Sequence, residues 1–133
     1  MRDQHDQKRI AIVAFNHLTQ DEDEAEFDTV GIDRFTPMTG VFNGVEERSY
    51  LIDADDLPAL RDALARTGQE CVLYRDGEFQ TYLLSKEDGY EKVTSPEGVK
   101  RQWIGRWVEV DATQAARSTS YTKFNNRYFT TRK

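Results

Sequence analysis

The sequence of 133 residues predicts a single α+β domain, in which an antiparallel sheet of five to seven strands carries one or two packed helices. Two local patterns indicate this fold class. The dipeptide Asn43-Gly44 separates two runs with strand composition and is typical of a tight hairpin turn. Leu57, Leu60 and Leu64 repeat at intervals of three and four residues, which indicates an amphipathic helix.

Residues 1–35 form an acidic N-terminal segment that is predicted to contain a helix. Apolar residues between 8 and 18 fall at helical spacing, although alternate residues from Ile10 to Ala14 also fit a strand. The length of this run and its lack of Gly and Pro favour the helix. The acidic run at 21–26 has no periodic apolar face, which predicts a solvated helix end or a loop.

Residues 36–133 are predicted to form a hairpin, a helix, a second hairpin and then strands rich in aromatic and basic residues. In the first hairpin, strands at 36–42 and 45–52 flank the turn, so that Tyr50 and Ile52 share one face. The helix is expected at 57–67, because aspartates precede it and Gly68 can end it in a left-handed conformation.

The rest of the core is predicted from turn dipeptides and alternation. Asp76-Gly77 indicates a second hairpin, and Asn125-Asn126 a third. The stretch at 102–110 alternates, which predicts a strand with Ile104 on one face and Trp107 on the other. Loops are expected at the two remaining segments, 96–98 and 112–120.

The net charge of −6 is unevenly distributed along the chain. Residues 1–62 hold fifteen acidic and six basic residues, whereas residues 99–133 hold two acidic and eight basic ones. This polarity fits an anionic partner for one end, a homo-oligomer closed as a dimer or ring, or an ordinary surface on which both signs meet after folding. The overall acidity argues against binding of duplex nucleic acid, which the protein would repel.

No metal, cofactor or covalent catalytic site is predicted from the motifs. The two histidines and the single cysteine, Cys71, do not form a metal-ligand spacing, and phosphate-loop patterns are absent from the sequence. Ser49 lacks the glycine-flanked elbow of a serine nucleophile. Cys71 is expected to point into a core, where apolar surroundings raise a thiol pKa and make it inert.

The C-terminal third mixes basic and aromatic side chains, a combination that suits a nucleotide or another small anionic ligand. Aromatic faces stack on bases, while Lys and Arg neutralise phosphates. The alternative is a strand with a buried aromatic face and a wet basic face. The candidate ligand-binding residues in this region are Arg101, Trp103, Arg106, Trp107, Tyr121, Lys123 and Arg127.

A second candidate site lies where the strand containing Glu47 and Ser49 meets the strand that follows the helix. If these strands are side by side, Glu47, Ser49, Gln69 and Glu70 converge near the C-terminal end of the helix. They would then either satisfy the free carbonyls of its last turn or form a polar pocket that binds a ligand. Glu47 and Gln69 are the residues assigned here to polar ligand recognition.

These same residues resemble a group of small phage and bacterial proteins. The matching elements are the strand Glu47-Arg48-Ser49-Tyr50-Leu51-Ile52, a helix, and Gly68-Gln69-Glu70 before an apolar strand. The aromatic tail at 121–129 is similar as well, so the likeness covers 40–84 and, loosely, the tail. The resemblance implies a phage or prophage setting, in which accessory proteins inhibit or evade host defence by binding.

We therefore hypothesise a non-enzymatic, phage-accessory type of binding protein that inhibits a host factor or sequesters a nucleotide-like anion. Two alternatives remain. One is a carboxylate-dependent nucleotide hydrolase with Glu47 or Glu70 as general base. The other is an acidic protein–protein interaction module. The cytoplasm, that of the host for a phage protein, is the expected compartment, because one cysteine forms no internal disulfide and no apolar run is long enough for a membrane span.

Overall fold

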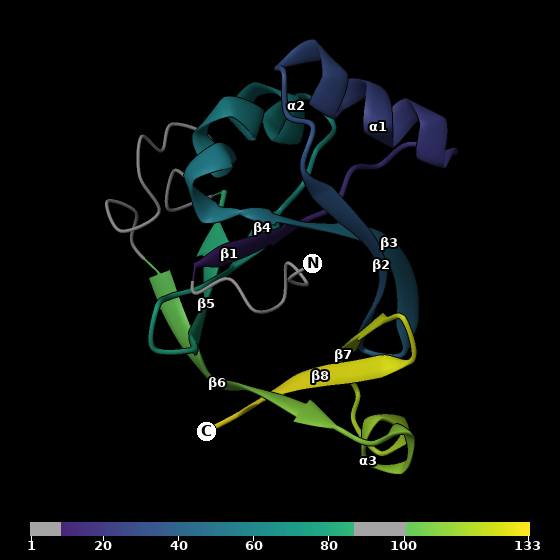
Figure 1. The fold of residues 1–133 in the computed structure, drawn as a ribbon, viewed down its shortest axis with the longest axis vertical. Coiled ribbons are helices and arrows are strands. Elements are labelled where there is room, and N and C mark those ends of the chain that lie inside the picture. The colour runs from purple at the N-terminus through teal and green to yellow at the C-terminus, as the bar shows by residue number, and fades with distance from the viewer. Residues whose placement is uncertain (1–8, 87–100) are drawn as a thin grey trace.

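A computed structural model describes residues 9–86 and 101–133, and within them the strands form a closed antiparallel barrel (Figure 1). The barrel has eight strands in the order β1-β3-β2-β7-β8-β6-β5-β4. The predicted open sheet of five to seven strands is therefore wrong. The prediction did not include closure of the sheet. Closure requires β1 to pair with both β3 and β4, and the closed sheet then has no edge strand. The strands are β1 (Ile10–Val13), β2 (Phe35–Phe42), β3 (Val45–Asp53), β4 (Cys71–Arg75), β5 (Gln80–Ser85), β6 (Arg101–Val110), β7 (Tyr121–Phe124) and β8 (Arg127–Arg132).

Strand β1 replaces the helix predicted at 8–18. Its residues are apolar on both faces, because Ala11 and Val13 belong to the core under the helices, whereas Ile10 and Ile12 pack inside the barrel with Leu51. A strand covered on both sides has no polar alternation, so its short apolar run could not be told from a helix by periodicity.

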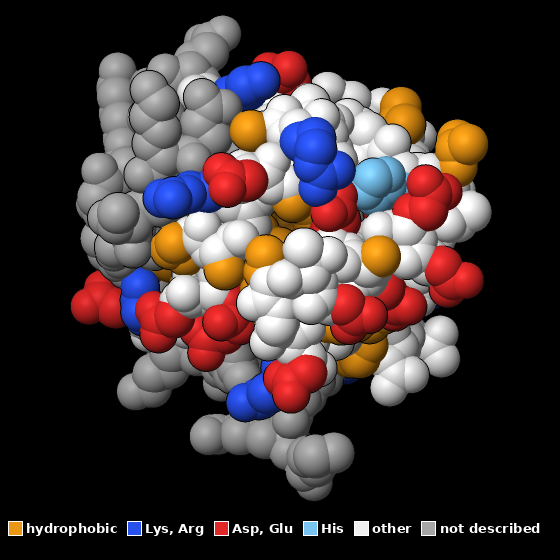
Figure 2. Space-filling view, turned by 90° about the horizontal axis from the view of Figure 1, so that it is seen from above, with side chains coloured by type: hydrophobic (Ala, Val, Ile, Leu, Met, Phe, Trp, Pro, Cys, Tyr) orange, Lys and Arg blue, Asp and Glu red, His pale blue; other side chains and the backbone are white. Residues whose placement is uncertain are grey.

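The acidic run at 21–26 lies within helix α1 (Gln20–Thr29), which begins at the capping residue Thr19. Its buried residues are Asp23, Glu26 and Phe27. The helix thus docks through two carboxylates and one ring, which explains why no apolar stripe predicted it. Acidic side chains predominate over basic ones on this helix-covered side of the molecule (Figure 2).

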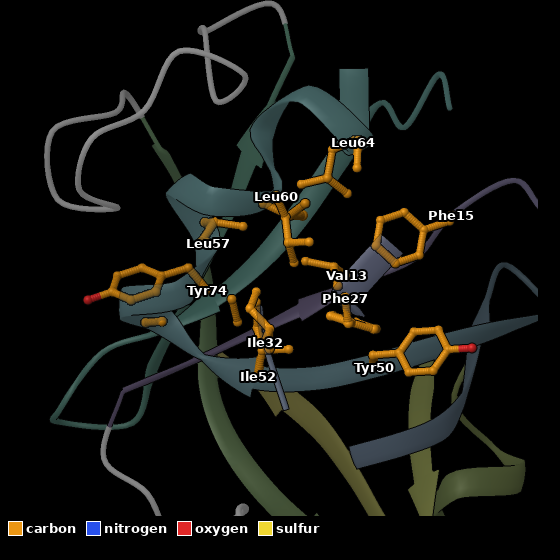
Figure 3. Close-up of a cluster of buried hydrophobic side chains, with 14 of the residues drawn as sticks. Val13, Phe15, Phe27, Ile32, Tyr50, Ile52, Leu57, Leu60, Leu64 and Tyr74 are labelled. Atoms are coloured by element: carbon orange, nitrogen blue, oxygen red, sulfur yellow. The ribbon is translucent and has the colours of Figure 1, made fainter. Parts of the chain in front are cut away.

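The main core lies between the outer face of the barrel and the helices (Figure 3). Tyr50 and Ile52 share this face, as predicted, and they pack with Phe27 of α1 and with Leu60 and Leu64 of the second helical segment. That segment was predicted as one helix at 57–67. It is divided into a 3₁₀ helix, η2 (Ala54–Leu60), and a short α-helix, α2 (Arg61–Arg66).

The three predicted hairpins are confirmed. Asn43 and Gly44 in the first turn, and Asn125 and Asn126 in the third, have positive φ. The loop predicted at 112–120 contains helix α3 (Ala112–Ala116), held by a capping box between Asp111 and Gln114 that the small polar composition concealed. The loop predicted at 96–98 lies outside the described residues. None of the helices in the described ranges is long and apolar enough to cross a membrane.

Candidate functional site

A cavity of about 350 Å³ occupies part of the barrel interior. Each of the eight strands contributes at least one residue to its lining, so the cavity lies within the ring of strands rather than on its outer surface. The neighbouring part of the interior is filled by Ile10, Met38 and Leu51. An eight-stranded barrel is just wide enough either to fill with side chains or to hold one small ligand, and this volume falls in the range of about 300–1,000 Å³ typical of ligand sites.

Polar groups line one side of the cavity, on the two strands that flank β1. Glu47 and Ser49 come from β3, Cys71 is the first residue of β4, and Gln69 lies in the connection just before it. The structure thus brings together three of the residues predicted to converge, with β1 between their strands. The fourth, Glu70, is exposed and does not belong to the described lining.

Gly40 of β2 makes room for the Ser49 side chain in this polar wall. In the β2–β3 pair it lies opposite Glu47. A Cβ atom at Gly40 would lie only 2.9 Å from Ser49 Oγ, closer than normal packing tolerates. The hydroxyl of Ser49, which donates to the Glu47 carbonyl at 3.4 Å, occupies the space that a side chain at Gly40 would fill.

The mouth of the cavity is marked by exposed lining residues. Glu47 is exposed there, and Phe42, at the tip of the β2–β3 hairpin, is 60 % exposed. The tip is tied to the neighbouring loop because Gly44 N–H donates to the Thr119 carbonyl at 3.1 Å. Cys71 lies half-buried in the wall, and burial, followed by the negative charges of Glu47 and Glu70, raises the pKa of its thiol.

An aromatic pair lines the opposite wall. Trp107 of β6 and Phe129 of β8 stack at 5.4 Å between ring centroids, with 17° between their planes. Trp107 is only 6 % exposed, so it lies deep relative to the mouth. Ile104 also lines the cavity.

Ile104 and Trp107 share the cavity because β6 contains a bulge. Strand β5 pairs with Trp103 and with Gly105 but skips Ile104. Gly105 has φ of +119°, and a Cβ there would lie 2.7 Å from the Arg132 carbonyl carbon, which restricts this position to glycine. The sequence prediction of Ile104 and Trp107 on opposite faces is therefore wrong.

Two of the predicted C-terminal aromatic residues, Trp107 and Tyr121, line the cavity together with Glu47 and Gln69. The third predicted ring, Trp103, is outside it: Trp103 is 45 % exposed and its Nε1 donates to Gln80 Oε1 at 2.9 Å.

The predicted basic residues do not join this lining in the described part of the chain. Arg127 forms an ion pair with Glu109 at 3.0 Å, and Arg101 packs over the Tyr82 ring at 4.2 Å. Arg106 and Lys123 are exposed on the outside of the barrel. The four predicted basic side chains thus lie outside the described lining of the cavity, whereas two of the three predicted rings, Trp107 and Tyr121, belong to it.

Sequence reasoning missed Arg75, a fully buried residue at the end of β4. Its guanidinium lies 4.3 Å from the centroid of the Phe79 ring and 5.8 Å from that of Trp107. The alternation of Cys71, Leu73 and Arg75 along one strand is the signal that could have placed it inside. In the described ranges, no group of three or more His, Cys, Asp or Glu side chains is arranged to hold a metal ion.

The fold is thus a closed antiparallel β-barrel with an internal cavity of the size typical of small-molecule sites. The family model of the S-adenosylmethionine lyase family matches residues 3–132. The chain therefore belongs to this family. No curated protein matches it.

This family match corrects the leading hypothesis about function. A non-enzymatic protein that inhibits a host factor or sequesters an anion conflicts with a family described by a lyase activity. Lyase chemistry also differs from the hydrolysis assigned to the runner-up. Both hypotheses were drawn from the charged outer surface and from single carboxylates, whereas the described site is an internal cavity with few charged groups.

Proposed function

We propose that this protein cleaves S-adenosylmethionine at a carbon–sulfur bond inside the barrel. Family membership supplies the substrate and the reaction class. The structural observation that supports the proposal is a cavity with an apolar interior, an aromatic pair at one wall, and a single carboxylate, Glu47, among its described lining.

The substrate has features that match these walls. Its sulfonium carries a positive charge that Glu47 attracts, and its amino acid end offers donors and acceptors to Gln69 and Ser49. Its adenosine part has a flat ring that can pack on Trp107. The proposed ligand is thus cationic at sulfur rather than the anion that the basic residues suggested.

An apolar cavity favours a reaction in which charge disappears. In the proposed step, a carboxylate oxygen of the substrate forms a bond to its own Cγ, and the Cγ–S bond breaks with its electron pair passing to sulfur. The products are homoserine lactone and neutral 5′-methylthioadenosine, and neither water nor an added proton is consumed. Since a carboxylate and a sulfonium neutralise each other along the way, low polarity destabilises the reactant more than the transition state.

This cyclisation makes modest demands on the protein. The nucleophile belongs to the substrate, and the leaving group is already neutral, so no strong base is required. The walls need to hold the substrate folded, with the carboxylate in line behind the Cγ–S bond. Elimination of a β-proton would instead need a general base placed at the substrate Cβ, and the one carboxylate in the described lining, Glu47, is exposed at the mouth.

The test is to incubate purified protein with S-adenosylmethionine in ¹⁸O-labelled water and to analyse products by mass spectrometry. We expect equal amounts of methylthioadenosine and homoserine lactone, with no label in the ring oxygen. An unsaturated amino acid would overturn the cyclisation, as would label on the γ-oxygen, and an unconsumed substrate would overturn the function.

Glu47→Gln is expected to lower kcat/KM for the sulfonium substrate by roughly 10-fold or more. The matched control is Glu46→Gln, which removes the same charge from the neighbouring position of β3, outside the described lining of the cavity. Equal losses in both variants would show that the general negative field, rather than Glu47 itself, recognises the sulfonium.

The phage or prophage setting, a role against host defence and a homo-oligomer remain predictions of the sequence. They are compatible with the proposed reaction but are supported only by the motif resemblance and the charge distribution.

A further inference from the structure

Two arginines lie directly opposite each other on the outside of the barrel. Arg106 of β6 pairs with Arg132 of β8 on one side and with Gln80 of β5 on the other. Directly paired residues point to the same side of a sheet. Gln80 shares its face with Tyr82, which packs against the core outside the barrel. The row formed by Gln80, Arg106 and Arg132 therefore faces outward.

Neither of these arginines has a counter-ion among the described residues. Both side chains are exposed, and no hydrogen bond or ion pair joins either of them to another residue that the structure describes. Paired strands lie about 4.8 Å apart, and like charges directly opposite each other destabilise a sheet. An anion that binds both guanidinium groups would remove this repulsion.

The surrounding sheet face is basic as well. Strands β5, β6, β7 and β8 contain five basic residues and a single acidic one, Glu109, which already pairs with Arg127. Helix α1 has six acidic residues and no basic one. Helices α1 and α2 lie away from β6 and β8 (Figure 1). The described part of the molecule is therefore polarised, with a positive sheet face on the side away from its acidic helix.

Trp103 adds an exposed aromatic ring next to the two arginines. It pairs with Tyr82, so it also faces outward, and it is 45 % exposed. Its Nε1 donates to Gln80 Oε1 at 2.9 Å, which holds the indole toward the position that pairs with Arg106. Two residues along β5 separate the partners of Trp103 and Arg106, a distance of roughly 7 Å. A nucleotide offers a flat base and a phosphate within that reach.

We propose that this outer face binds single-stranded nucleic acid, with one phosphate between Arg106 and Arg132 and a base stacked on Trp103. An acidic peptide would use the arginines but not the ring, and the net charge of −6 opposes the dense charge of a duplex. The proposal adds a second site to the enzyme and goes beyond the lyase reaction, because none of these three residues belongs to the described lining of the cavity.

The test measures the fluorescence anisotropy of a labelled DNA single strand of about ten nucleotides with the full protein, in a series of salt concentrations. Each neutralised phosphate contributes about −0.7 to the slope of the logarithm of the association constant against the logarithm of salt concentration. The double variant Arg106→Gln/Arg132→Gln should therefore give a slope that is about 0.7 shallower. Trp103→Leu should weaken binding about 5-fold or more and leave the slope unchanged.

The matched control is Arg34→Gln/Arg61→Gln, which removes the same charge from exposed positions outside these four strands. Equal losses in the double variant and its control would overturn the proposal, as would a wild type that does not bind the strand at low salt. If oligoglutamate displaces the strand and Trp103→Leu binds as tightly as the wild type, the face takes acidic peptides and the proposal fails.

The same variants separate this proposal from the proposed reaction. Thermal unfolding checks that each variant is folded, and cleavage of S-adenosylmethionine should be unchanged in all of them. Binding of the strand without cleavage leaves the outer site standing and overturns the reaction. Cleavage without binding of the strand does the reverse.

Discussion

Tyr50 of β3 donates a hydrogen bond of 2.8 Å to Asp23 of helix α1, and both residues are fully buried. Arg48 donates to the same carboxylate oxygen at 2.9 Å. Burial, followed by the hydrogen bond to Asp23, raises the pKa of Tyr50 well above its usual value, so the phenol stays a donor at any working pH. This contact fixes α1 against the barrel on the strand that also carries Glu47 and Ser49.

Tyr50→Phe should lower the free energy of unfolding by about 1–3 kcal/mol, because it leaves a buried carboxylate with one donor fewer. The ring remains in its cluster with Phe27, so the lost packing is small. Urea denaturation measures the change. Tyr128→Phe is the matched control, since no hydrogen bond of the Tyr128 hydroxyl is described, and it should shift stability by no more than about 0.5 kcal/mol. Equal effects of the two substitutions would contradict the prediction.

Low pH should destabilise the packing of α1, because it protonates the buried carboxylate of Glu26. Burial raises the pKa of Glu26, but hydrogen bonds from Arg66 at 2.6 Å and His17 at 2.9 Å outweigh it, and the pKa lies below its usual value of 4.5. The folded state therefore holds the charged form more tightly than the unfolded chain does. This stability is complete above about pH 4.5 and is lost as the pH falls through the lower folded-state pKa.

Glu26→Gln should accordingly flatten the acid side of a plot of urea midpoint against pH, and Arg66→Gln should give an intermediate curve. The midpoints are compared from neutral pH down into the acid range below the usual carboxyl pKa of 4.5. A Glu26→Gln variant that lost stability in acid as steeply as the wild type would rule out Glu26 as the cause.

Gly105→Ala should destabilise the protein by at least about 2 kcal/mol, since its φ of +119° and the nearby Arg132 backbone both exclude a side chain. Binding of methylthioadenosine should weaken as well, because the bulge holds Ile104 and Trp107 on the same wall. Thermal unfolding and calorimetry measure the two effects. Gly77→Ala, at a position with open space around it, should change stability by less than about 1 kcal/mol.

Cys71 provides a chemical reporter of the cavity, because it is the one cysteine of the sequence and lines the wall beside Glu47. Its raised pKa predicts slow alkylation by iodoacetamide at pH of about 8. Glu47→Gln removes a charge that raises this pKa, so the rate should increase, whereas Glu46→Gln should leave it unchanged. Saturating methylthioadenosine should protect the thiol. Mass spectrometry follows the modification. An alkylation rate that changes neither with methylthioadenosine nor with the Glu47→Gln substitution would place the thiol outside the site.

Local turn chemistry made the hairpins predictable. Asn43-Gly44 and Asn125-Asn126 adopt the positive φ that few other residues tolerate, so their composition identifies the turn without tertiary information. Closure of the barrel was not predictable in this way. It depends on Ile10–Val13 pairing with two strands far along the chain, and a short strand buried on both faces carries no periodic signal.

The polar side of the site could be predicted from the sequence. Glu47, Ser49 and Gln69 lie in or next to strands whose positions follow from the Asn43-Gly44 turn and the helix pattern. The aromatic side could be predicted only in part. Trp107 and Tyr121 stood out by residue type, but the bulge at Gly105 reverses the alternation that would have assigned the face of Trp107. The basic residues were predicted to bind the ligand because they are abundant near the C-terminus. Their number does not show whether their side chains point into the barrel.

The hydrogen bond between Gly44 and Thr119 joins the tip of one hairpin to the loop before β7, directly beside the exposed Phe42. A ring of strands cannot part along its length without breaking ladder pairs, so passage into the cavity is confined to its ends. The rate at which products leave would then be governed by how often these two loops separate. The size of the side chain at position 42, at the mouth, and the length of the 117–120 connection are therefore the places to alter turnover without changing the Glu47 and Trp107 walls.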